Sequence, residues 1–488
     1  MNCSRTKQTR RKEMQMEKRT DMRAEALDTL IDIERNKKLS HIAIGETLMR
    51  NQFEKKADRA FYTRLCEGVT ERKIYLDYIL DHYSKTPMKK CKPLIRSLLR
   101  MGAYQILFMD VRDAAACSEA VSLAKKRGFG RLSGFVNGVL RTLVREKENL
   151  PVPDKKDDVK YVSITYSVPE WLSKLIIEQY GKESAEKIFA SFLEARPLTI
   201  RTNLSKTTPE ELEKELEEAG VKVEKGNYLP YAFTISNLNY LGKIAAFRQG
   251  KFAVQDESSQ LAVAIADINE GNFVLDVCAA PGGKTFHAAD RLKGAGKVLS
   301  RDLTEYKTEL IEENKDRMHY ENVEVQQWDA LEEDESLLES VDVLLADLPC
   351  SGLGIMGRKN DIKYQMTEEQ LGELAALQRQ ILSVVWKYVK PGGQMIFSTC
   401  TLNKGENGLR KIHHYIWYLS RSICHRILKT EQEVRDIYSS YREKIPATAS
   451  LFLNLKDRRR SSMDSSMDLK SMTLEELTDC VMELGEKK

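Results

Sequence analysis

The feature that most constrains the fold is an alternation of short apolar strands with helices from Phe273 onward. Each apolar run is followed by residues with helical spacing of apolar side chains. Because parallel neighbours need crossover connections, this alternation predicts a doubly wound α/β sheet with helices on both faces. Ligands of such sheets bind beyond the carboxyl ends of the strands. The predicted strands are 273–277, 297–300, 323–327, 343–346 and 394–397.

The 488 residues exceed what one hydrophobic core usually supports, so we expect several domains. Apolar residues lie three and four apart through most of the first third of the chain, which predicts an all-helical domain. Pro151 and Pro153 open a charged linker, and mixed helical and strand-like runs follow it. The predicted parts are a basic disordered tail (1–20), a helical domain (21–150), a linker (151–160), a small α+β subdomain (161–250), the sheet domain (251–407) and an aberrant C-terminal tail that does not continue the sheet pattern (408–488).

Composition excludes several classes of protein. No apolar run approaches the roughly 18 residues of a membrane span, and the basic start of the chain has no apolar stretch behind it. We therefore expect neither membrane insertion nor a secretory signal. Nine cysteines, an odd number at irregular spacing, predict free thiols in a reducing, cytoplasmic compartment, and no Cys/His pattern suggests a metal. The net charge of +4 means that nucleic-acid binding would need local basic patches. We expect a monomer.

A glycine loop directly follows the first predicted strand and precedes a helix. Glycines at this place let the backbone approach a nucleotide-like ligand closely. A phosphate-binding P-loop would need a glycine five residues before Gly283, where the chain has Cys278, and Pro281 removes an amide. The pattern favours the first loop of a methyltransferase that binds S-adenosylmethionine. The candidate loop consists of Cys278, Ala279, Ala280, Pro281, Gly282, Gly283 and Lys284.

Carboxylates follow the second and third predicted strands. Asp302 ends the second strand, where a carboxylate can accept the two hydroxyls of a ribose. Asp329 follows the third strand and could accept from an adenine amino group. Either residue alone would more often be a helix cap or a solvated loop residue. Two of them beside the glycine loop support a nucleoside-shaped cofactor.

The fourth and fifth predicted strands each deliver a cysteine to the same edge of the sheet. Cys350 follows Asp347, and Cys400 follows the fifth strand. Carbon 5 of a pyrimidine becomes nucleophilic only after a nucleophile adds to carbon 6, and a thiolate of lowered pKa does this well. Asp347 could hydrogen-bond the ring, and the second thiol could act as the base that releases product. Chemistry alone does not decide which thiol has which role.

The pairing of Asp347-Leu348-Pro349-Cys350 with Ser398-Thr399-Cys400 resembles the NOL1/NOP2/Sun family of RNA cytosine-5 methyltransferases. This resemblance implies that Cys400 is the nucleophile and that Cys350 helps to release product. Leu348 stands where the family usually has alanine.

The front half is similar to a narrower group, the bacterial small-subunit (16S) ribosomal RNA methyltransferases of the RsmB (Sun/Fmu) type. The matching runs include 100–107, 134–141, 166–171 and 255–260. This resemblance implies a NusB-like, RNA-binding helical domain, a Rossmann-like catalytic domain and a ribosomal RNA substrate.

Basic clusters are the candidate RNA contacts, although each alone would more often be a solvated face. A cytosine can be attacked at carbon 6 only when it is unstacked, so we expect a single-stranded loop as substrate. The candidates are Lys89, Lys90, Lys125, Lys126 and Arg127 in the helical domain, and Arg358 and Lys359 after Cys350.

Two alternatives stay open. The chain could be an RNA-binding or antitermination factor with an inactive methyltransferase half, although the intact cysteine pair argues against it. After Asn407 the family pattern ends, and a final strand with an Asp-Gly-Phe-Phe run is absent. We expect a frameshift close to Asn407, with a divergent extension as the alternative.

Overall fold

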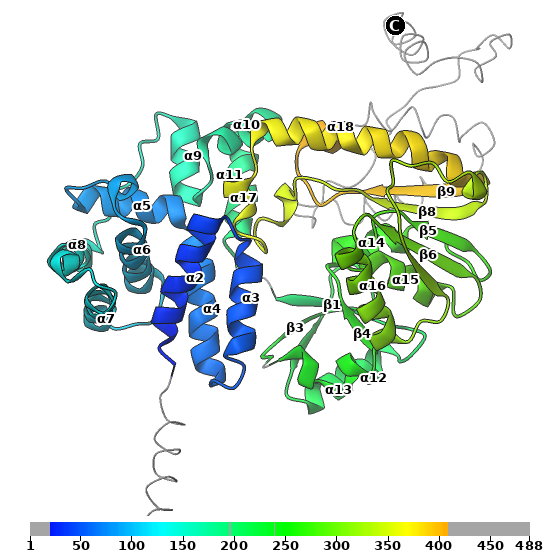
Figure 1. Cartoon of the computed structure of the whole chain (residues 1–488), viewed down its shortest axis with the longest axis horizontal. Coiled ribbons are helices and arrows are strands. Elements are labelled where there is room, and N and C mark those ends of the chain that lie inside the picture. Colours follow the sequence, from blue (N-terminus) through cyan, green and yellow to red (C-terminus); the bar gives the residue numbers. More distant parts are fainter. Residues whose placement is uncertain (1–19, 195–196, 239, 408–488) are drawn as a thin grey trace, which may run out of the picture. The chain divides into compact units, whose positions relative to one another are not determined.

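The computed structural model describes residues 20–194, 197–238 and 240–407 (Figure 1). The predicted tails at 1–20 and 408–488 therefore lie, apart from Thr20, outside the described residues.

The first part is helical, as predicted. Asp21 caps its first helix by accepting from the backbone N–H groups of Arg23 and Ala24. Close helix packing explains Gly68, because a Cβ at this position would lie 1.9 Å from the Tyr104 ring. The elements are α2 (Met22–Asn36), α3 (Ser40–Arg50), α4 (Lys56–Glu71), α5 (Lys73–Tyr83), η1 (Met88–Lys90), α6 (Pro93–Phe108), α7 (Asp113–Lys126), η2 (Gly130–Leu132) and α8 (Ser133–Glu146).

Three further helices and a small sheet follow the predicted linker. The sheet has four strands in the order β2-β3-β1-β4, and the pairings between neighbours are antiparallel. The helices preceding it pack instead on residues beyond Cys350, among them Leu353 and Met356. The elements are α9 (Asp158–Tyr166), α10 (Glu170–Tyr180), α11 (Lys182–Phe192), β1 (Leu198–Thr202), α12 (Pro209–Glu218), β2 (Lys222–Lys225), β3 (Ala232–Ser236), η3 (Leu241–Lys243), α13 (Ala245–Arg248) and β4 (Phe252–Val254).

The predicted doubly wound sheet has five strands in the order β7-β6-β5-β8-β9, and the pairings between neighbours are parallel. Its elements are α14 (Glu257–Ala264), β5 (Phe273–Asp276), α15 (Gly283–Arg291), β6 (Lys297–Asp302), α16 (Glu305–Met318), β7 (Val323–Gln327), η4 (Glu335–Leu337), β8 (Val341–Asp347), η5 (Leu353–Ile355), α17 (Ile362–Gln365), α18 (Glu368–Val385), η6 (Trp386–Tyr388), β9 (Val389–Ser398) and α19 (Lys404–Asn407).

Helices cover both faces of this sheet (Figure 1). Val274 and Val298 face α14, α15 and α16, whereas Leu275 and Leu344 face α18. The strand order reverses between β5 and β8, which is the point where doubly wound sheets bind ligands. Within the described residues β9 is the edge strand on its side, and none of the described helices is long and apolar enough to cross a membrane.

Candidate active site

The glycine loop follows β5, where the sequence predicts it, and its last two residues, Gly283 and Lys284, begin α15. Gly282 has a φ of +100° and a Cβ there would lie 2.2 Å from the Phe286 ring, so only glycine fits without strain. Asp276, at the end of β5, is buried and accepts from the Thr285 hydroxyl at 2.8 Å. Burial raises the pKa of Asp276 to about 7. Sequence reasoning did not single out this carboxyl group.

Asp302 is fixed at the end of β6. Its carboxylate accepts from the Ala280 backbone N–H at 2.9 Å, the Leu303 backbone N–H at 2.8 Å and the Lys307 ammonium at 2.9 Å. The loop and the second strand are thereby joined by one side chain. Asp329 lies beyond β7 and accepts from the Leu331 backbone N–H at 2.9 Å. The structure therefore places both predicted carboxylates at consecutive strand ends.

Asp347 joins the cofactor loop to the neighbouring strands. It forms an ion pair with Lys284 of the glycine loop and accepts from the Ser398 hydroxyl of β9 at 2.9 Å. Lys284 also donates to the Ser259 hydroxyl at 3.0 Å. The Lys284 side chain is mostly buried, with 10% exposed, whereas 36% of the Asp347 side chain is exposed. Asp347 can thus be reached by a ligand while its orientation is fixed.

The two predicted cysteines meet at the ends of β8 and β9. Cys350 Sγ lies 3.1 Å from Cys400 Sγ, and the Cys400 backbone N–H donates to Cys350 Sγ at 3.3 Å. The hydrogen bond between the thiols, assisted by burial, raises the pKa of Cys350, and the same hydrogen bond lowers the pKa of Cys400. Burial and the Asp347 charge oppose this lowering of the Cys400 pKa, whereas the charges of Lys284 and Lys359 add to it. Cys400 is the more exposed of the pair.

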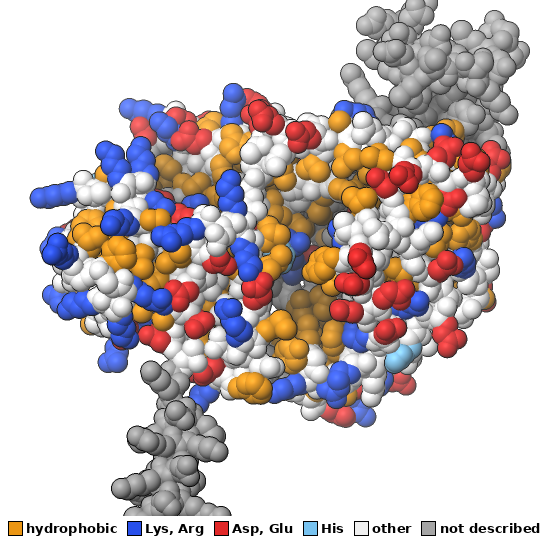
Figure 2. Space-filling model, in the orientation of Figure 1, with side chains coloured by type: hydrophobic (Ala, Val, Ile, Leu, Met, Phe, Trp, Pro, Cys, Tyr) orange, Lys and Arg blue, Asp and Glu red, His pale blue; other side chains and the backbone are white. Residues whose placement is uncertain are grey.

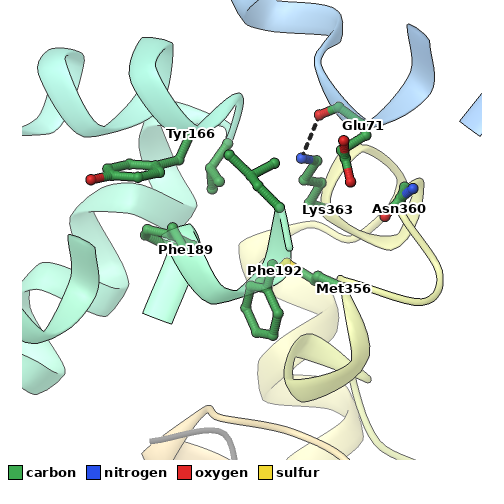
Figure 3. Close-up of a pocket in the computed structure, with 9 residues that line it drawn as sticks. Glu71, Tyr166, Phe189, Phe192, Met356, Asn360 and Lys363 are labelled. Carbon is green, nitrogen blue, oxygen red and sulfur yellow. Dashed lines mark hydrogen bonds between the residues drawn. The ribbon is translucent and has the colours of Figure 1, made fainter. Parts of the chain in front are cut away.

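The segment after Cys350 contacts the helical domain. Asp361 accepts from the backbone N–H and the hydroxyl of Ser40, each at 2.7 Å. Lys363 is buried and donates to the backbone carbonyl of Glu71 at 2.8 Å (Figure 3). Burial lowers the pKa of Lys363 to about 7. The helical domain therefore holds the segment that follows the first cysteine.

The predicted RNA contacts lie in two different settings. Arg358 forms an ion pair with Asp256 and lies 3.5 Å from the Thr199 hydroxyl, and Lys359 beside it is exposed. In the helical domain all five candidate side chains, Lys89, Lys90, Lys125, Lys126 and Arg127, are exposed.

Two of those five side chains have acidic partners. Lys126 pairs with Asp21 at 3.5 Å and Arg127 with Asp28 at 2.6 Å. The Lys92 ammonium lies 5.4 Å from the centre of the Phe129 ring, so the segment after Lys89 and Lys90 lies beside the segment after Arg127. Figure 2 shows Lys and Arg side chains spread over this domain.

A parallel sheet with a glycine loop after β5, carboxylates at the ends of β6 and β7 and two facing thiols defines a methyltransferase of the S-adenosylmethionine-dependent class. Family models agree part by part. A NusB family model matches residues 20–145, an RsmF/B-like ferredoxin-like domain matches 168–239, and the 16S rRNA methyltransferase RsmB/F model matches 263–435. The last match continues past Asn407, so the predicted start of the aberrant C-terminal tail at residue 408 stays a prediction.

The probable ribosomal RNA small subunit methyltransferase B of Bacillus subtilis (strain 168) is 37% identical over 405 residues, covering 82% of this chain and 89% of that protein. The ribosomal RNA small subunit methyltransferase B of Vibrio cholerae is 31% identical over 360 residues, covering 72% and 80%. The crystal structure of PH0851 matches with a TM-score of 0.67 at 25% identity, covering 81% of this chain and 89% of that chain. The chain belongs to the family of small-subunit ribosomal RNA methyltransferases B. Membership confirms the predicted fold and the methyl donor S-adenosylmethionine, and it supports ribosomal RNA as the substrate.

Proposed function

We propose that this chain methylates carbon 5 of a cytosine in small-subunit ribosomal RNA through a covalent bond between Cys400 and carbon 6 of the base. The observation that carries the proposal is the 3.1 Å approach of the Cys350 and Cys400 sulfurs at the strand ends next to the cofactor loop. A single buried thiol would be ordinary core packing. Two thiols in contact beside Asp347 are suited to adding to a ring and then leaving it.

The described residues fit the methyl donor. A carboxylate has about four acceptor positions, and Asp302 fills three of them with Ala280, Leu303 and Lys307. The Asp302 side chain is only 3% exposed whereas that of Lys307 is 45% exposed, so a ribose hydroxyl reaches the carboxylate when the Lys307 ammonium moves aside. We propose that Asp302 holds the ribose, that Asp329 accepts from the adenine amino group, and that residues 278–284 close around the cofactor. S-adenosylmethionine, when bound there, supplies an electrophilic methyl group.

The environment of the two thiols supports the roles that the family resemblance implies. Cys400 has a lowered pKa and is the more exposed, so its thiolate attacks carbon 6 and pushes electron density to carbon 5. Asp347 hydrogen-bonds the N3 and amino edge of the ring. Once Cys400 is bonded to carbon 6, its hydrogen bond and charge no longer raise the pKa of Cys350, so Cys350 can release its own proton to solvent and, as a thiolate, remove the carbon 5 proton after methyl transfer. The C6–S bond then breaks, which restores the ring double bond and the Cys400 thiolate.

RNA binding is proposed for the exposed basic side chains. Lys89, Lys90 and Lys125 offer charge to phosphates on the helical domain, together with Lys126 and Arg127 if their ion pairs exchange. Lys359 is close enough to Cys400 for its charge to lower the pKa of that thiol, so Lys359 is the better candidate for a phosphate contact beside the target base.

The test uses the full chain, methyl-labelled S-adenosylmethionine and unmodified small-subunit ribosomal RNA, followed by digestion to nucleosides. The expected product is labelled 5-methylcytidine. Label on another position of cytidine or on another base would contradict the proposed chemistry. RNA retention without any methyl transfer would favour a binding factor with an inactive methyltransferase half.

A further inference from the structure

A buried glutamate lies between the two cysteine loops. Glu406, in α19, is only 4% exposed although it carries a carboxylate. Burial of such a group is costly unless donors surround it. The donors around the Glu406 carboxylate therefore indicate its role in the fold.

The Glu406 carboxylate accepts from both loops. On one side it accepts from the Ser351 backbone N–H at 2.8 Å and the Ser351 hydroxyl at 2.6 Å, immediately after Cys350. On the other side it accepts from the Thr401 hydroxyl at 3.2 Å, immediately after Cys400. The residues that flank the two thiols thus share one acceptor.

Two further donors fix the carboxylate itself. The Asn403 side-chain amide donates to it at 3.1 Å. The Gln378 amide on α18 donates to it at 3.3 Å and to the Pro349 carbonyl at 2.8 Å. The position of Glu406 is therefore set by the helix behind the sheet as well as by the loops.

The loops also touch directly through their backbones. The Gly354 N–H donates to the Cys400 carbonyl at 2.9 Å, and a Cβ at Gly354 would lie 2.8 Å from that oxygen. Each cysteine follows the end of its strand, so the strand ladder does not extend to either thiol. Contacts beyond the strands must set the distance between the two sulfurs.

We infer that Glu406 is a positioning residue, whose carboxylate holds the loops of Cys350 and Cys400 so that both thiols reach the same base. This inference rests on the paired-thiol chemistry of the proposed function. Glu406 does not touch the reacting atoms. It acts through Ser351 and Thr401, and Gln378 supports it.

The first test measures the thiol spacing without cofactor or RNA. Dibromobimane bridges two neighbouring thiols, each of which displaces one bromide, and peptide mapping identifies the Cys350–Cys400 product. In Glu406→Gln the side-chain amide N–H groups meet at least one N–H donor in either orientation, the Asn403 amide on one side or the Ser351 backbone and the Gln378 amide on the other, so the loops separate. We expect bridging to be slower by about tenfold, and turnover to fall by about 100-fold with the KM for the methyl donor nearly unchanged, because a misplacement of about 1 Å has this effect. Bridging at the wild-type rate would overturn the inference.

Two further variants keep the test decisive. Glu373→Gln changes an exposed glutamate on α18 and should leave bridging and turnover at wild-type values. If Glu406→Gln fails to fold by circular dichroism, Ser351→Ala keeps the backbone N–H and removes the hydroxyl, which contacts both Glu406 and the Thr401 hydroxyl, each at 2.6 Å. It should slow bridging in the same direction by a smaller factor, and unchanged bridging would overturn the inference. If the wild-type chain forms no 5-methylcytidine, the proposed function fails, but the bridging comparison still decides whether Glu406 sets the thiol spacing.

Discussion

The cofactor side and the cysteine side of the site are built differently. On the cofactor side, Thr285 contacts Asp276 and Ala280 contacts Asp302, over separations of 9 and 22 residues within consecutive strand–helix units. On the cysteine side, Ser351 contacts Glu406 across 55 residues and Ser40 contacts Asp361 across 321. The first side is fixed mainly by contacts within and between neighbouring strand–helix units, and the second depends on more remote segments. We therefore expect variants on the cofactor side to change affinity and variants on the cysteine side to change turnover.

The largest effect is expected for Cys400→Ser. A hydroxyl at neutral pH is a much weaker nucleophile than a thiol of lowered pKa, so turnover should fall on the order of 10³-fold or more. Methyl transfer to ribosomal RNA measures it, with Cys91→Ser in the helical domain as the control. Turnover near the wild-type value would refute the assignment of the nucleophile and remove the contrast between the two sides.

Cys350→Ala should allow attack and methyl transfer but slow release of the product. Without the second thiol, removal of the carbon 5 proton is impaired, and a protein–RNA adduct should survive denaturing electrophoresis. An adduct that accumulates in Cys400→Ala rather than in Cys350→Ala would show that the two roles are reversed.

Asp302→Ala should act on affinity. The variant leaves the Ala280 and Leu303 N–H groups without their acceptor and removes the proposed ribose contact, so binding of S-adenosylmethionine should weaken by about 1 to 3 kcal/mol. Calorimetry measures this, with the exposed Asp316→Ala on α16 as the control. Unchanged affinity in Asp302→Ala would exclude the ribose contact.

Asp276→Asn should change the pH dependence of stability. Burial raises the folded-state pKa of Asp276 from 3.8 to about 7, so between these values the folded state holds a proton that the unfolded state releases. Its contribution to stability is lost as the pH rises through about 7. Relative to the wild type, the variant should gain stability of about 2 to 3 kcal/mol between pH 5 and pH 8. Denaturant unfolding at both pH values checks this, and parallel profiles would contradict it.

Sequence patterns predicted the elements that local periodicity determines. The strand at 323–327 has the predicted bounds, and the others differ by a few residues, such as β9, which begins at Val389 rather than at 394. A β-bulge at the start of the β8 and β9 pairing, near Gly392 and Gly393, hides the first part of that strand from a period-two pattern.

The cysteine pair was predictable because adjacent parallel strands end at one edge of a sheet. The residues that hold this pair in place could not be predicted from the sequence. Glu406 is a single glutamate in a four-residue helix, and nothing in its local sequence indicates burial. In the sequence Arg358 was predicted to be a basic side chain available to RNA. Its ion pair with Asp256 depends on the tertiary fold and could not be predicted. Contacts between residues so far apart leave no periodic signal in the chain.

The most direct test of the central claim is mass spectrometry of the chain trapped on RNA that contains 5-fluorocytidine. Fluorine at carbon 5 cannot leave as a proton does, so the adduct persists after methyl transfer. The account predicts a nucleotide attached to the peptide that carries Cys400, with the Cys350 peptide unmodified. Attachment at Cys350, or methylation of cytidine with no adduct at either thiol, would contradict it.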